Sequence, residues 1–183
     1  MIQTTEELRD LISSVKPGFC AVDMEADSLH RYKERICLIQ FSDGEAHSLI
    51  DPLAIEDMSP FIEFMGRTDM WLHGADYDMT MFRREYDTLP PNIWDTQIAG
   101  RLIGARRFGY ANLVEDYLSV ELSKSSQKAD WAKRPLTEKM EEYALNDVIY
   151  LRDLSSLFTQ KLEELGRLDW FYESCAFAKE RSE

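Results

Sequence analysis

The chain has 183 residues, 44% of them hydrophobic and 11% aromatic, which is typical of one folded domain that buries roughly two-thirds of its unfolded surface. Its 34 acidic and 21 basic residues leave a net charge of −13. This charge argues against broad binding to phosphate backbones unless metal ions and local basic side chains neutralise the site. The three cysteines lie far apart without a CxxC spacing, which suggests neither a zinc site nor a disulfide framework.

No targeting or membrane segment is visible in the sequence. No apolar run approaches the ~20 residues that span a bilayer, and the acidic N-terminal segment lacks the features of a signal peptide. We therefore expect a soluble, cytoplasmic protein that does not bind membranes.

The first part of the chain predicts one helix followed by three strands. Apolar residues recur at helical spacing over residues 5–15. Strand-like runs follow at 19–25, 35–42 and 45–50, and Asp43-Gly44 between the last two is a strong hairpin signal.

The remainder of the chain alternates brief strands with helices. Helices are predicted over 54–65, 76–87, 95–104, 110–119 and 137–165, with strands at 70–73 and 92–94. Residues 166–183 have helical character but no evident core of their own. This order predicts a mixed α/β sheet, with three antiparallel strands followed by parallel strands, flanked by helices.

Asp23 and Glu25 stand out in the first predicted strand, FCAVDME, because the run before them is apolar. Side chains alternate across a strand, so the two carboxylates share one face. Such a pair suits a hard divalent cation such as Mg²⁺ or Mn²⁺. A strand end that simply reaches solvent is the alternative for this pair taken alone.

Two further segments carry candidate site residues. Tyr143 and Asp147 are four residues apart in a predicted helix and therefore share a helical face. Asp76 and Asp78 lie at a predicted helix start, where capping the helix is an alternative function for a carboxylate.

Taken together, these segments resemble a known family. The order Asp-x-Glu, a helix-start Asp and Tyr-x-x-x-Asp is similar to the DEDD superfamily of 3′–5′ exonucleases, in its tyrosine branch, and in particular to ribonuclease D-like enzymes. Supporting segments are HGADYD at 73–78, WDTQ at 94–97 and DWAKRPLTEKMEEYALNDVIYL at 130–151. The family places its catalytic acid five residues after the histidine, which selects Asp78 and leaves Asp76 as the expected N-cap.

The resemblance implies an RNase H-like fold and catalysis by two divalent metal ions, Mg²⁺ or Mn²⁺. In the family, Asp23 would bridge both ions, Glu25 and Asp147 would hold the ion near the attacking water, and Asp78 would hold the second ion. Tyr143 would orient the water through its hydroxyl group. We expect positioning rather than strong general-base catalysis from a phenol that titrates near 10.

Substrate contacts are predicted on two other segments. The stretch DMEADSL resembles a motif of proofreading exonuclease domains, which implies that Leu29 packs on the terminal base. A solvent-exposed leucine in a turn is the alternative. Basic and amide side chains that could contact phosphates are Lys124, Gln127, Lys128 and Arg134. Trp131 is expected to be a core residue, and His73 is expected to complete hydrogen bonds at the end of its strand rather than bind metal.

The expected function is a metal-dependent 3′–5′ exoribonuclease that hydrolyses phosphodiester bonds from the 3′ end of single-stranded RNA, as in RNA or tRNA 3′ processing. An exonuclease acting on DNA or on short oligonucleotides is the alternative, and a catalytically silent nucleic-acid-binding module is a third. The exonuclease domain is expected to cover residues 1–175. The resemblance would make residues 176–183 a tail leading to a further helical domain.

Overall fold

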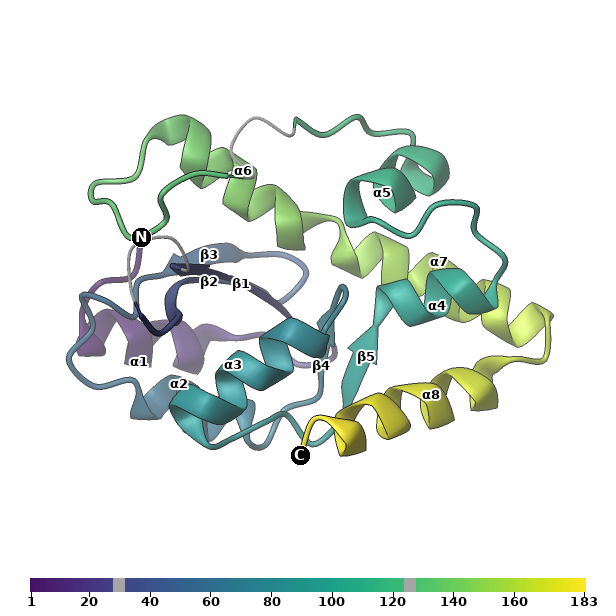
Figure 1. The fold of residues 1–183 in the computed structure, drawn as a ribbon, viewed down its shortest axis with the longest axis horizontal. Helices are drawn as coiled ribbons and strands as arrows, with labels where there is room; N and C mark the ends of the chain where they lie inside the picture. Colours follow the sequence, from purple (N-terminus) through teal and green to yellow (C-terminus); the bar gives the residue numbers. More distant parts are fainter. Residues whose placement is uncertain (28–31, 124–127) are drawn as a thin grey trace.

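The computed structural model describes residues 1–27, 32–123 and 128–183 (Figure 1). A five-stranded sheet in the order β3-β2-β1-β4-β5 lies at its centre. The strands are β1 Ala21–Asp27, β2 Arg35–Ser42, β3 His47–Ile50, β4 Met70–Leu72 and β5 Ile93–Asp95. β1, β2 and β3 pair in antiparallel fashion, whereas β1, β4 and β5 are parallel. The predicted mixed sheet is confirmed.

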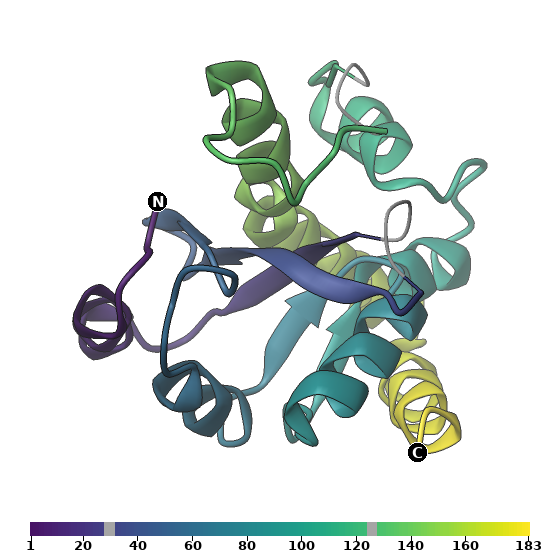
Figure 2. The ribbon, with the colours of Figure 1, turned by 60° about the vertical axis from the view of Figure 1, so that its left-hand side comes forward.

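Helices cover both faces of this sheet. Their bounds are α1 Thr5–Ser14, α2 Ser59–Met65, α3 Asp76–Tyr86, α4 Thr96–Leu102, α5 Tyr110–Leu118, α6 Glu138–Ile149, α7 Leu151–Glu164 and α8 Leu168–Arg181. In Figure 2, α1, α2 and α3 lie on one side of the sheet and α6 lies on the other. α4, α5, α7 and α8 surround a second core beside β4 and β5.

The alternation of β1 directs its side chains to these two layers. Val22 and Met24 are buried in the core formed with α1, α2 and α3. Asp23 and Glu25 therefore point to the opposite face. Glu25 pairs with Leu38 of β2, whose side chain is buried in a cluster with Ala144 of α6. The carboxylate pair thus lies on the face that α6 covers, and the predicted sharing of one face is confirmed.

The predicted helix over 54–65 is shorter than expected, because α2 begins only at Ser59. Asp51 folds the preceding segment into a turn: its carbonyl oxygen accepts the N–H of Ile55, and its carboxylate accepts the N–H of Leu53. Pro60 in the first turn of α2 suits this later start, since proline needs no intrahelical N–H partner there.

The single long helix predicted over 137–165 is instead two helices, α6 and α7, which meet at Tyr150. The hydroxyl group of Tyr110 lies in the break. It donates to the carbonyl of Asn146 at 2.6 Å and accepts the N–H of Tyr150 at 3.3 Å. A continuous helix would join that N–H to that carbonyl directly, so the inserted hydroxyl accounts for the break.

The C-terminal segment forms α8, which packs on the second core through Phe171 and Cys175, both buried. The predicted helical character of residues 166–183 is confirmed, and the core on which α8 packs is shared with α4, α5 and α7. The predicted boundary after residue 175 falls inside this helix. Throughout the part of the chain that the structure describes, every helix is too short or too polar to cross a bilayer.

Candidate active site

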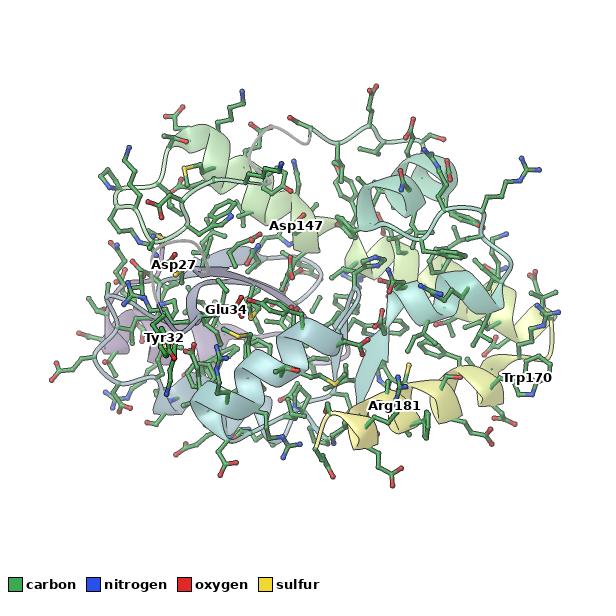
Figure 3. The ribbon with its side chains drawn as sticks, in the orientation of Figure 1. Asp27, Tyr32, Glu34, Asp147, Trp170 and Arg181 are labelled. Atoms are coloured by element: carbon green, nitrogen blue, oxygen red, sulfur yellow. The ribbon has the colours of Figure 1, made fainter. Side chains whose placement is uncertain are left out.

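Three carboxylates from two elements converge between the sheet and α6. One carboxylate oxygen from each of Asp23, Glu25 and Asp147 lies within 4.8 Å of the other two. Asp147 is near the C-terminal end of α6, above the sheet (Figure 3). Asp23, Glu25 and Asp147 were predicted to form one site, and the structure brings them together.

Asp78 joins this cluster from α3. Its carboxyl group interacts directly with that of Asp23, and only 6% of the residue is exposed. Among the residues that the structure describes, none forms a hydrogen bond with the Oδ2 atom of Asp78. A buried carboxylate oxygen without a donor is costly unless a cation or proton compensates it.

Asp76 does not cap α3, contrary to expectation. Ala75 occupies the N-cap position, and Asp76 is exposed in the first turn. The carboxylate of Asp95 at the end of β5 accepts the N–H groups of Gly74 and Ala75, both at 2.9 Å. Asp95 also caps its own helix, α4, by accepting the N–H of Gln97. One buried carboxylate thus fixes the helix start that carries Asp78.

The electrostatics of the cluster favour a positive partner. Burial raises the pKa of each carboxyl group of the cluster above its ordinary value, in Asp23, Glu25, Asp78 and Asp147. The negative charge of Asp23 raises the pKa of the other three further. Four partly or fully buried carboxyl groups in contact cannot all ionise without a compensating cation.

Tyr143 lies on α6 one turn before Asp147. Burial, followed by the charges of Asp147, Glu25 and Asp23, raises the pKa of Tyr143 to about 12. Its hydroxyl group therefore stays protonated near neutral pH, which suits positioning of a water rather than proton abstraction. The ring stacks on Trp131, with centroids 6.0 Å apart, and Trp131 is buried as expected.

Gln40 is a site residue that the sequence analysis missed. It is fully buried on β2, pairs with Asp23 across the sheet, and donates from Nε2 to Oε1 of Glu25 at 3.2 Å. The available signal was one amide in the otherwise apolar run ICLIQF, at the position facing the carboxylate strand.

The structure describes only some of the residues that were predicted to contact the substrate. Leu29, Lys124 and Gln127 lie outside the described residues, and Lys128 is exposed. Arg134 does not fit a phosphate contact, because its five N–H donors are used by protein acceptors. These acceptors are both carboxylate oxygens of Asp51 and the carbonyls of Cys37, Trp131 and Lys133. His73 hydrogen-bonds Thr96 through Nδ1, as expected of a residue at a strand end.

Comparisons with known proteins show the family to which the chain belongs. A family model described as 3′-5′ exonuclease matches residues 1–163. The chain belongs to this 3′–5′ exonuclease family.

Ribonuclease D proteins are among its relatives. That of Serratia proteamaculans is 42% identical over 149 residues, which are 80% of this chain and 40% of the relative. That of Escherichia coli is 35% identical over 186 residues, or 99% of this chain and 49% of the relative. The chain thus spans half or less of the length of these two proteins.

Solved structures of other proteins share the fold. The crystal structure of Escherichia coli RNase D, described as an exoribonuclease involved in structured RNA processing, has a TM-score of 0.92 and 35% identity. The match covers 100% of this chain and 50% of the Escherichia coli RNase D chain. Brucella melitensis NrnC bound to pGG has a TM-score of 0.82 and 26% identity, covering 93% of this chain and 86% of that chain.

Removing the Tyr110 hydroxyl group is expected to destabilise this exonuclease domain. In Tyr110→Phe, the carbonyl of Asn146 and the N–H of Tyr150 lose their shared partner next to Asp147. We expect the free energy of unfolding to fall by about 1–3 kcal/mol, measured by urea denaturation. Tyr117→Phe on the same helix is the matched control, since no described residue hydrogen-bonds its hydroxyl. Equal stability of the two variants would contradict this account of the helix break.

Proposed function

We propose that this chain is a metal-dependent 3′–5′ exonuclease that removes nucleotides from the 3′ end of single-stranded RNA. One observation carries the proposal: four carboxyl groups from β1, α3 and α6 meet beside the hydroxyl-bearing ring of Tyr143. Membership of the exonuclease family supports it. Residues 1–175 are proposed as the exonuclease domain, and a cytoplasmic location stays a prediction.

The residues fit a pair of divalent cations. The cluster offers only oxygen ligands, which Mg²⁺ and Mn²⁺ prefer, and the buried Oδ2 of Asp78 has no donor among the described residues. Asp23, Glu25, Asp78 and Asp147 would hold the ions. When bound, such ions supply positive charge that stabilises the phosphodiester transition state and makes water more acidic.

The protein residues would then position the reacting groups. Tyr143, protonated and stacked on Trp131, would hydrogen-bond the attacking water and fix its direction. Gln40 would keep Glu25 in place through its amide hydrogen bond. Asp95 would hold the start of α3, and with it Asp78, against the cluster.

A second candidate substrate is a very short oligonucleotide. The observation that favours it is the likeness to Brucella melitensis NrnC, of which this chain covers most and which was solved bound to pGG. Single-stranded DNA is a third candidate substrate for the same carboxylate cluster.

One assay tests the proposal and separates these substrates. The protein is incubated with 5′-labelled RNA, DNA and dinucleotides in Mg²⁺, in Mn²⁺ and in chelator. The proposal predicts a ladder that shortens one nucleotide at a time from the 3′ end of RNA and disappears with chelator. Trimming that ignores chelator would refute the metal requirement, and equal trimming of DNA would refute the preference for RNA. Cleavage restricted to dinucleotides would establish the second candidate instead.

A further inference from the structure

A pocket of about 240 Å³ lies directly beside the carboxylate cluster, between the start of α5 and the C-terminal part of α6. Tyr143 and Asp147 form one side of it, so the pocket and the cluster share two residues. Leu122 contributes an apolar wall. A nucleotide whose phosphate lay at the cluster would therefore place its sugar or base in this pocket.

Asn112 and Asn146 line the pocket, and each carries a side-chain amide. Both residues are partly buried. Within the described part of the chain, neither side-chain amide has a hydrogen-bond partner. Partly buried amides of pocket-lining residues, with no partner among the described residues, are available to a ligand that both donates and accepts hydrogen bonds.

The backbone around these amides is fixed. Tyr110 ties the start of α5 to α6 through its hydrogen bond to the carbonyl of Asn146. Gly109 leaves room for the other amide, since a Cβ atom there would lie 3.0 Å from Nδ2 of Asn112. Asn112 on α5 and Asn146 on α6 are thus held on two helices that line the same small pocket.

We propose that this pocket holds the ribose of a nucleotide flanking the scissile phosphate, and that Asn112 and Asn146 select RNA over DNA by hydrogen-bonding its 2′-hydroxyl. The inference rests on the proposed exonuclease function. A 2′-hydroxyl group is both donor and acceptor, and so is a carboxamide. A deoxyribose in the same place leaves the amides unpaired, which disfavours DNA.

The test compares kcat/KM for an all-ribose oligonucleotide with that for matched oligonucleotides carrying one 2′-deoxy sugar, at the last or the second-last position. For wild type, the 2′-deoxy sugar at one of these positions should lower kcat/KM roughly tenfold or more. In Asn112→Ala and in Asn146→Ala, the ratio of ribose to deoxyribose rates should fall to within about threefold of unity. Asn92→Ala is the matched control, because it removes a side-chain amide that hydrogen-bonds Asp69 instead. This variant should keep the wild-type ratio of ribose to deoxyribose rates.

Two further measurements separate recognition from folding. Gly109→Ala displaces the Asn112 amide without removing it, so the ratio should fall partly while the melting temperature stays near that of wild type. Fluorescence anisotropy in chelator should show tighter binding of labelled RNA than of DNA, and Asn112→Ala should lose this difference.

The experiments distinguish failure of this inference from failure of the proposed exonuclease function. A wild-type enzyme that trims RNA in a chelator-sensitive way but ignores single 2′-deoxy sugars would overturn the inference and leave the proposed function intact. Variants in which both rates fall together, with the ratio unchanged, would make the amides structural and also overturn it. Absence of chelator-sensitive trimming by wild type would refute the proposed function, and the inference with it.

Discussion

Replacing Asp23 with asparagine is expected to lower exonuclease activity by roughly 10³-fold or more and, in chelator, to raise the melting temperature. Asp23 contacts both Asp78 and Asp147, and its charge raises the pKa of the other three carboxyl groups in the cluster. The substitution therefore removes a central cation ligand and relieves repulsion among buried carboxylates. Activity and stability should move in opposite directions, as at other sites that are strained for function.

Asp76→Asn is the matched control for this substitution. Asp76 lies two residues before Asp78 but is exposed and caps nothing. We expect its activity to stay within about twofold of wild type and its stability within about 0.5 kcal/mol. An Asp23→Asn protein that trims RNA as fast as wild type would remove Asp23 from the site.

Replacing Arg134 with alanine is expected to destabilise the fold by about 3–5 kcal/mol, measured by urea denaturation, because it removes the cationic partner of the buried Asp51 carboxylate. Asp51 is only 1% exposed and accepts two hydrogen bonds from the guanidinium group. The same group donates to the carbonyl of Cys37 in β2, which links the segment before α6 to the sheet. It also donates to the carbonyls of Trp131 and Lys133 within that segment. Arg107→Ala, which breaks an exposed pair with Asp116, should leave the midpoint of urea denaturation close to that of wild type.

The loss in Arg134→Ala should depend on pH. Burial alone would raise the pKa of Asp51, but the hydrogen bonds from Arg134 and Gln3 outweigh it and hold that pKa below its ordinary value. A depressed carboxyl pKa contributes stability in full above the unfolded value of about 3.9, and this contribution is lost as pH falls through the folded pKa. The stability difference between wild type and variant should therefore narrow below about pH 4. A difference that stays constant with pH would show that the ion pair is not its source.

Local patterns were sufficient to predict much of this fold and site. The alternation of apolar residues in β1 placed Asp23 and Glu25 on one face, and helical spacing placed Tyr143 and Asp147 together. These predictions depend only on residues a few positions apart. The family resemblance selected Asp78 over Asp76, which spacing alone left open.

Contacts between distant residues account for what was not predicted. The helix break at Tyr150 arises from a hydroxyl 40 residues earlier in the chain. Arg134 was predicted to contact a phosphate because its partner Asp51 lies 83 residues away in the sequence. Local sequence patterns do not predict a contact at that separation. Similarly, Asp95 takes the capping function expected of Asp76, because parallel pairing of β4 and β5 brings it beside the start of α3.

The central claim is that the four carboxyl groups hold divalent cations. The most direct measurement is the melting temperature of wild type and of Asp23→Asn, titrated with Mg²⁺ or Mn²⁺ after chelator treatment. At cation concentrations about 100-fold above Kd, each bound ion should stabilise wild type by about 2.7 kcal/mol, a rise of roughly 5–10 °C per ion, and the melting temperature of Asp23→Asn should shift far less. A wild-type melting curve indifferent to both cations, or an equal rise in Asp23→Asn, would contradict the claim.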